Sequence, residues 1–332
     1  MTHAVAALLG LLALGAGPIT PAPTLDVQFN FDIASASGVV GTTWASVSYD
    51  QKHDELFTVS GGLVHVYNEA GMESYSFGGD GDLGSVERVA VLDSGETLVL
   101  TAVDGKRTVL RCDFRGERVG TYQVEPLPDG FEKFTPDRIQ VQQDKVYLVE
   151  ISSMRVLVGD LEGHLAQAYD LAGLVRGKNP DMRLGMSGFW ADPAGNMVVT
   201  MPYAFTAFAV SSAGELRQFG TRGSSPGKFN IVGSVAVDEQ GYLFVLDRLR
   251  SVVIVFDRAL RFITEFGYRG DGPTNLIAPY DLAVGNGKVF VSQARERGVK
   301  VFRYEVVQPP PPAPPRAPAF GSPGRPAGAG RG

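Results

Sequence analysis

The fold of this 332-residue chain is decided by the stretch GKFNIVGSVAVDEQGYLFVLD at residues 227–247 and its continuation RLRSVVIVFDRALRFITEFG at residues 248–267. Short apolar runs rich in Val, Ile and Phe alternate here with Asp, Gly and Asn, which is typical of β-strands joined by tight turns. We expect four strands in this stretch, the last of which ends at Phe266 and Gly267.

Weaker copies of this four-strand unit recur along the chain at a spacing of roughly 43 to 50 residues. Their first strands are expected at 45–50, 88–93, 138–141, 188–192 and 281–284. The last copy lacks a fourth strand, whereas an unassigned strand at 25–31 precedes the first copy. We therefore predict an all-β, six-bladed β-propeller of four-stranded antiparallel blades, with the ring closed by the N-terminal strand.

Three segments are expected along the chain. Residues 1–22 contain a continuous apolar block of signal-peptide length, although no Lys or Arg precedes it, and a retained N-terminal helix is the alternative. Residues 23–307 form the propeller. Residues 308–332 are rich in Pro, Gly and Ala and are expected to be a disordered spacer, with a docking peptide as the alternative. We expect a secreted or periplasmic protein with no transmembrane anchor in its mature form.

The charge balance argues against nucleic acid as a partner. The formal net charge is −6, and the three arginines of the tail contribute +3, so the rest of the chain carries −9. Binding to a phosphate backbone favours the opposite sign. The single cysteine, Cys112, lies in a predicted apolar strand and is expected to be buried and unreactive.

The opening stretch carries the phrase PGKF at 226–229, followed by VAVD at 235–238 and GYLFVLD at 241–247. This phrase resembles the NHL repeat, and the last copy carries a second recognisable version that begins at Leu276. The resemblance covers about residues 25–307 and implies a propeller that serves mainly as a binding module for proteins, RNA or small ligands. It also implies a structural role for Asp247, which only this copy retains after its second strand.

Enzymes also occur among six-bladed propellers, including lactonases and amidating lyases. Those most similar to NHL proteins hold a metal at the central channel, so the resemblance implies that an enzyme of this type would have metal ligands there. None of the four histidines of this chain falls on a predicted inner strand. The segment GGDGDLG at 78–84 only faintly suggests a calcium loop, because it lacks a terminal bidentate acid. We therefore expect no catalytic residue, no metal ligand and no cofactor.

Antiparallel connectivity gives the ring two different faces. The inter-blade loops and the loops between strands two and three share one face, which we call the loop face; the remaining turns form the turn face. Acidic residues are concentrated on the expected turn face, whereas basic residues mixed with acids lie on the loop face, where an ordinary solvated surface is the alternative interpretation. The candidate ligand- or partner-binding residues of the loop face are Arg88, Arg107, Arg138, Arg155, Tyr203, Phe205, Arg248, Arg250 and Arg297.

These observations predict a non-catalytic, monomeric binding scaffold that docks a protein partner or an anionic ligand on its loop face. Arg88 and Arg138 are expected to begin the inner strands of adjacent blades and to ring the mouth of the channel. The alternative is a metal-dependent hydrolase or lyase, lactonase-like or amidating-lyase-like, with its site in the channel.

Overall fold

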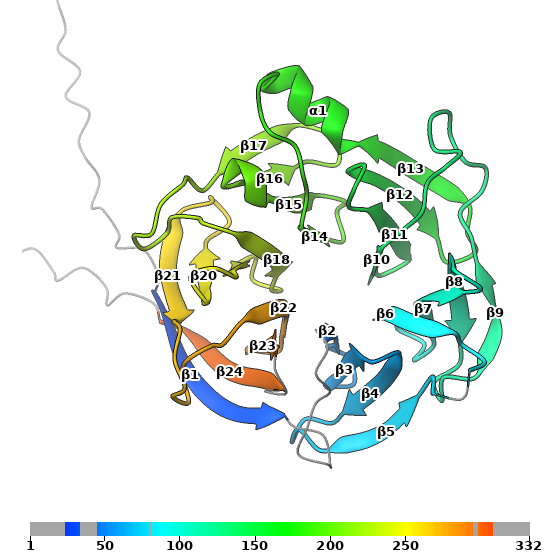
Figure 1. The fold of residues 1–332 in the computed structure, drawn as a ribbon, viewed down its shortest axis with the longest axis horizontal. Helices are drawn as coiled ribbons and strands as arrows, with labels where there is room; N and C mark the ends of the chain where they lie inside the picture. The colour runs from blue at the N-terminus through cyan, green and yellow to red at the C-terminus, as the bar shows by residue number, and fades with distance from the viewer. Residues whose placement is uncertain (1–23, 34–44, 80, 295–297, 308–332) are drawn as a thin grey trace, which may run out of the picture.

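A computed structural model describes residues 24–33, 45–79, 81–294 and 298–307. In these residues the chain forms a closed ring of six four-stranded antiparallel sheets with one short α-helix (Figure 1). The predicted six-bladed β-propeller is confirmed. The expected signal peptide at 1–22 and the expected tail at 308–332 lie outside the described residues. No helix among the described residues is long and apolar enough to cross a membrane.

In each blade the first strand lies nearest the centre of the ring and the fourth lies at its rim (Figure 1). Blade one contains β2 (Ser46–Asp50), β3 (Glu55–Ser60), β4 (Leu63–Tyr67) and β5 (Glu73–Phe77). Blade two contains β6 (Ser85–Val91), β7 (Thr97–Val103), β8 (Lys106–Cys112) and β9 (Arg118–Tyr122). Blade three contains β10 (Arg138–Gln142), β11 (Lys145–Glu150), β12 (Arg155–Asp160) and β13 (Leu165–Asp170).

The second half of the ring repeats this order. Blade four contains β14 (Gly188–Ala191), β15 (Met197–Met201), β16 (Thr206–Val210) and β17 (Leu216–Phe219). Blade five contains β18 (Val232–Val237), β19 (Leu243–Asp247), β20 (Val252–Phe256) and β21 (Phe262–Gly267). Blade six contains β22 (Pro279–Gly285), β23 (Lys288–Gln293), β24 (Val299–Val307) and, as its fourth strand, β1 (Thr24–Ile33).

The two ends of the described chain meet in blade six, as predicted. β1 pairs antiparallel with β24 from Thr24 opposite Val307 to Ile33 opposite Val299, with one irregularity between Phe29 and Phe31. This pairing gives the last blade its fourth strand. It also fastens the first described strand to the last one, so the ring cannot open without breaking a sheet.

The hydrophobic core is divided among the six contacts between neighbouring blades. Each of six clusters of buried side chains joins one blade to the next, and the cluster between blades six and one closes the series. Cys112 is fully buried in the cluster between blades one and two, as predicted, and burial raises the pKa of its thiol to about 11. The centre of the ring is therefore left to the residues of the inner strands.

The turn between the third and fourth strands repeats the same geometry in five blades. A side-chain oxygen at its first residue accepts main-chain N–H groups, and the residue three positions later has a φ between 66° and 94°. The pairs of first residue and positive-φ residue are Asn68 and Gly71, Asp113 and Gly116, Asp160 and Gly163, Ser211 and Gly214, and Asp257 and Leu260. Glycine suits four of these positions because it has no steric penalty at positive φ.

Three local expectations need correction. The inner strand of blade two begins at Ser85 rather than at Arg88: Ser85 and Val86 already pair with β7, and a bulge at Glu87 then shifts the register before Arg88. Arg88 therefore lies along the channel wall instead of at the first position of the strand. Arg107 belongs to β8 rather than to a loop, since the hairpin before it is tight. The connection from blade three to blade four contains α1 (Leu171–Lys178), which no helical pattern in the sequence indicated.

Closure can be tested at Phe302 of β24, which is 1% exposed and packs edge-to-face against Phe29 of β1 and Phe266 of β21. We expect Phe302→Ala to lower the free energy of unfolding by about 3–5 kcal/mol, because it opens a cavity where three strands meet. Urea denaturation measures this change. The matched control, Val119→Ala, alters a 59% exposed residue and should change stability by less than about 0.5 kcal/mol. Equal effects of the two substitutions would contradict the proposed role of this contact.

Candidate functional site

Side chains from three blades and a main-chain N–H group from a fourth converge where the inner strands line the channel. Nη1 of Arg88, on β6, donates to Oδ2 of Asp281, on β22, at 2.9 Å. The same oxygen accepts the main-chain N–H of Val47 of blade one at 3.4 Å, and the hydroxyl of Ser234 of blade five also hydrogen-bonds the carboxylate. Asp281 is 3% exposed, so this ion pair is shielded from solvent. It links blade two to blade six, the two neighbours of blade one.

The electrostatic balance favours the ionised form of Asp281. Burial alone would raise the pKa of this carboxyl group, but the positive charges of Arg88 and Arg138 and the hydrogen bonds from Ser234 and Arg88 outweigh it and lower the pKa to about 2. Burial likewise opposes the charge of Arg88, but Asp281 outweighs it and raises the pKa of the guanidinium above its ordinary value. The pair is a fixed, fully charged element of the channel wall.

Arg138 is the second arginine of the channel and has no such partner. Its guanidinium forms no hydrogen bond or ion pair with any residue in the part of the chain that the structure describes. Burial and repulsion by Arg88 lower its pKa to about 10, in spite of the weaker attraction of Asp281, Tyr280 and Asp137. The positive charge of Arg138 is thus incompletely compensated by its surroundings, and its N–H donors remain available.

Asp137, directly before Arg138, forms its hydrogen bonds with the main chain. Both of its carboxylate oxygens accept the N–H of Ile151 at 3.2 Å, and burial raises the pKa of the group although Arg138, Arg107 and Arg88 oppose this shift. Arg107 itself forms an ion pair with Glu87 through a bifurcated hydrogen bond, with distances of 2.9 and 3.1 Å from Nε to the two carboxylate oxygens. These two acids therefore do not satisfy the Arg138 guanidinium.

Arg248 and Tyr280 form a wall beside these charges. The Arg248 guanidinium stacks over the Tyr280 ring at 4.6 Å, and its Nη2 donates to the Tyr280 carbonyl at 3.1 Å. Its Nε atom is buried and has no hydrogen-bond partner in the described chain. A Cβ atom at Gly233 would lie only 2.6 Å from this Nε, so a glycine is needed for Arg248 to lie flat against β18. Tyr280 is close enough to interact electrostatically with both Arg88 and Arg138.

The structure assigns local roles to two other predicted arginines. Arg250 forms a bidentate ion pair with Glu265, the two side chains being 10% and 3% exposed, and it also donates to the carbonyl of Lys228 at 2.9 Å. It therefore fastens the rim strand of blade five. Arg155 donates to the carbonyl of Gly130 and stacks over Phe131 at 5.2 Å, which holds the loop between blades two and three.

The predicted aromatic residues each stack with an arginine that is not part of the channel cluster. Tyr203 is 57% exposed and lies under Arg183 at 4.9 Å, whereas Phe205 lies under Arg222 at 4.6 Å. Both aromatic residues belong to the connection between β15 and β16, on the loop face as expected. Arg297, the last predicted residue, lies outside the described residues.

Sequence reasoning missed Asp281, Ser234, Asp137 and Tyr280. The clearest signal was Asp281, a carboxylate placed on the innermost strand of a blade whose neighbouring residues are apolar. A charge at such a position needs a partner. The partner could not be identified without the ring geometry, since Arg88 is 193 residues away in sequence.

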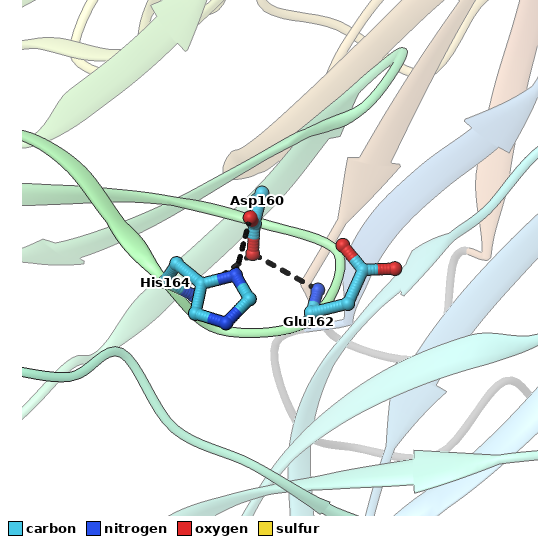
Figure 2. Close-up of side chains that lie close together, drawn as sticks. All are labelled: Asp160, Glu162 and His164. Atoms are coloured by element: carbon cyan, nitrogen blue, oxygen red, sulfur yellow. Dashed lines mark hydrogen bonds and ion pairs between the residues drawn. The ribbon is translucent and has the colours of Figure 1, made fainter.

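A different cluster, Asp160, Glu162 and His164, has the residue types of a metal site (Figure 2). Oδ2 of Asp160 lies 2.7 Å from Nδ1 of His164, and Oδ1 accepts the N–H groups of Glu162 and His164 at 3.0 and 2.8 Å. Asp160 raises the pKa of the imidazole by this hydrogen bond and by its charge. The same main-chain contacts recur at Asp113 and Asp257, which lack the histidine, so the cluster is a member of the repeated turn.

Fold and site together define a six-bladed β-propeller whose channel is lined by a buried ion pair and a second arginine. No known protein-family profile matches the chain, and no curated protein matches it in sequence. Solved propellers match it in structure. A protein of unknown function from Bacteroides thetaiotaomicron aligns with a TM-score of 0.60 at 11% identity, over 85% of this chain and 76% of that one.

Several structural neighbours are described as enzymes. A gluconolactonase from Xanthomonas campestris aligns with a TM-score of 0.54 at 13% identity, over 86% of this chain and 98% of its own length. A streptogramin B lyase aligns with a TM-score of 0.51 at 10% identity, over 85% and 98% of the two chains. At these identities the likeness establishes the shared fold alone.

The turn interpretation of the Asp160 cluster predicts the response to metals. We expect Asp160→Ala to lower the melting temperature by an amount similar to that of Asp113→Ala, because each substitution removes the same main-chain contacts. Neither Ca²⁺ nor Zn²⁺ should raise the melting temperature of the unmodified protein. A metal-dependent increase that disappears in Asp160→Ala would show that the cluster is a metal site; differential scanning calorimetry distinguishes the two outcomes.

The lowered pKa of Asp281 predicts a pH dependence of stability. A carboxyl group with a pKa of about 2 in the folded state and 3.8 ordinarily contributes stability that is present above pH 4 and is lost as the pH falls towards 2. The shift corresponds to about 2–3 kcal/mol. In urea denaturation between pH 4 and pH 2, the unmodified protein should therefore lose about 1.5–2 kcal/mol more free energy of unfolding than Asp281→Asn, because the remainder of the effect falls outside this pH range. Parallel pH profiles would contradict the ion pair.

Proposed function

We propose that this chain is a non-catalytic binding propeller that holds an anionic ligand at its central channel. The observation that carries the proposal is the Arg138 guanidinium, which is desolvated beside a second arginine and has no hydrogen-bond or ion-pair partner among the described residues. An anion placed there would accept its N–H donors and compensate its charge.

The neighbouring charges support an anion rather than a cation at this position. Asp281, an acid on the inner strand β22, already accepts N–H or O–H groups from Arg88, Val47, Leu282 and Ser234. Few lone pairs remain for a positively charged ligand. A positive charge that is partly shielded from solvent attracts anions more strongly than the same charge on an open surface does.

A metal-dependent hydrolase or lyase remains the alternative, and the enzyme descriptions of two structural neighbours favour it. Such chemistry needs several acid or histidine ligands around one point. The described channel residues offer Asp281 and Asp137, and both carboxylates are engaged as described above. Among the described residues, the group of acids and histidine whose ligand atoms lie close enough together for a metal is the Asp160 cluster, which belongs to a turn outside the channel. The channel chemistry therefore fits anion binding better.

The cellular location of the protein and its class of propeller are proposed from the sequence alone. The N-terminal apolar segment supports secretion or a periplasmic location, and the phrase at 226–247 supports membership of the NHL class of binding propellers. In agreement with the role implied by that resemblance, Asp247 is fully buried and accepts main-chain N–H groups from Asn230, Leu249 and Arg250.

The proposal predicts that Arg138→Gln weakens anion binding by about 10- to 100-fold, because it removes charge-assisted hydrogen bonds. Isothermal titration calorimetry with sodium acetate and with sodium phosphate measures the loss. Folding should be preserved, since the surroundings of Arg138 disfavour its charge. The matched control is Arg217→Gln on the exposed rim strand β17, which should bind as the unmodified protein does. Equal binding by the two variants would refute the proposed role of Arg138.

A further inference from the structure

A cavity of about 370 Å³ lies where the loop between blades five and six meets β1 and β24, near the rim of the ring (Figure 1). Its walls are formed by Phe29 and Asp32 of β1, Lys300 of β24, Gln293 of β23, and residues 270–273 and Asn275 of the loop. Cavities that hold small organic molecules have volumes from about 300 Å³ upward. We call this volume the blade-six cavity; none of the channel arginines or acids lines it.

The loop that borders the blade-six cavity repeats a loop one blade earlier. In both 221–229 and 268–276, the main-chain N–H of the last residue donates to the carbonyl of the first, at 2.9 and 2.8 Å. The residue after each loop donates its N–H to the second strand of the following blade, to Asp247 in blade five and to Gln293 in blade six. The two loops therefore hold equivalent positions, and the residues beneath them can be compared directly.

In blade five an acid of the rim strand closes the space under this loop. Glu265 of β21 accepts the N–H of Gly227 of the loop at 3.1 Å, and it also forms the ion pair with Arg250. The Glu265 side chain is only 3% exposed, so the loop and the blade are in close contact.

Blade six has different residue types at the equivalent register positions. Glu265 pairs with Ile254 of β20, whereas Asp32 of β1 pairs with Lys300 of β24. A buried cation thus replaces a buried isoleucine, and the acid is shorter by one methylene group and has a 48% exposed side chain. Among the described residues, Asp32 accepts a hydrogen bond from Lys300 and none from an N–H group of the loop. The contact that closes this space in blade five is missing, and the cavity takes its place.

The charges that line the blade-six cavity compensate one another. Nζ of Lys300 lies 3.2 Å from Asp32 and donates to the carbonyl of Pro273 at 2.9 Å. The same atom lies 4.9 Å from the centre of the Phe29 ring. Asp271, the third charged residue of the lining, has a contact of its own. A cationic ligand would meet the ammonium group and an anionic ligand would meet two carboxylates, so a neutral ligand fits best.

Hydrogen-bond donors and acceptors line the cavity together. Nδ2 of Asn275 donates to two loop carbonyls at 3.2 and 3.3 Å, and Oε1 of Gln293 accepts a main-chain N–H at 2.7 Å. Among the described residues, the amide oxygen of Asn275 and the amide nitrogen of Gln293 have no further partner. They add an acceptor and a donor to those of Asp32 and Lys300. Each hydroxyl group of a sugar both donates and accepts, so a sugar can satisfy this mixture.

We propose that the blade-six cavity binds one neutral hexose unit. The groups that would hydrogen-bond its hydroxyls are those of Asp32, Asn275, Gln293 and Lys300, beside the Phe29 ring. The site is independent of the anion site proposed in the channel, because the two share no residue.

A panel of sugars tests the proposal with the full chain. We expect at least one of D-glucose, D-galactose, D-mannose and N-acetyl-D-glucosamine to bind with a dissociation constant on the order of millimolar. D-glucuronate should bind at least fivefold more weakly than that sugar because of the two carboxylates, and cyclohexanol should do so because it has a single hydroxyl. Saturation-transfer NMR titrations measure these affinities. Tighter binding of D-glucuronate, or no binding of any neutral sugar at tenfold higher concentration, would overturn the proposal.

Two aspartates of the same strand provide a matched pair of variants. Asp32→Ala should weaken binding of the sugar about five- to twentyfold, because it removes a charged hydrogen-bond acceptor. Asp26→Ala makes the same change at another exposed position of β1 and should leave the affinity unchanged. Circular dichroism checks that both variants are folded, and equal affinities of the two folded variants would count against the site.

The location of the sugar can be read from the unmodified protein, without any variant. In two-dimensional NMR of isotope-labelled protein, the sugar should shift the side-chain amide signals of Asn275 and Gln293 and the main-chain signal of Gly272. The side-chain signal of Asn286, in the tight turn between β22 and β23, should stay in place. Binding that leaves the first three signals unchanged would place the sugar elsewhere and overturn the proposal.

Discussion

The pairing of β1 with β24 is the constraint on which the rest of this structure depends. The six hydrophobic clusters each join two neighbouring blades, so the described residues form no central core that could hold the ring together by itself. Closure fixes the position of β22 against β2 and therefore fixes Asp281 across from Arg88. The geometry of the channel is a consequence of an antiparallel pairing at the rim.

The buried ion pair between Arg88 and Asp281 is an inefficient way to stabilise the fold. Removing a carboxylate and a guanidinium from water costs several kcal/mol for each ion, and an apolar pair of similar size often stabilises a fold better. Here the ion pair holds a defined charge in a channel that apolar side chains could have filled. With Asp281 engaged, Arg138 beside it remains a cation with available donors. We interpret the pair as the element that sets the electrostatic character of the channel.

The fold could be predicted from the sequence because the strands and turns of each blade are encoded by residues close together in the chain. Apolar alternation predicted the strands, and the missing fourth strand of the last copy together with the extra strand at 25–31 predicted closure. The candidate site could be predicted only in part. Arg88 and Arg138 could be placed on inner strands, but the bulge at Glu87 and the partnership with Asp281 depend on the ring as a whole. The helix α1 was missed because eight residues that include two glycines carry almost no helical signal.

Two arginines of similar sequence setting show why loop charge alone is a poor guide to function. Arg250 and Arg138 both lie at the loop-face ends of strands or loops, yet Arg250 is saturated by Glu265 and by the Lys228 carbonyl, whereas Arg138 has no comparable partner in the described chain. The difference lies in distance from the axis. Near the rim, Glu265 of the same blade pairs with Arg250, whereas at the inner strands Asp281 pairs with Arg88 and Asp137 accepts a main-chain N–H group, so neither acid forms an ion pair with Arg138. Among the described residues, a charge near the channel therefore depends on groups from other blades for its compensation, as Arg88 does on Asp281.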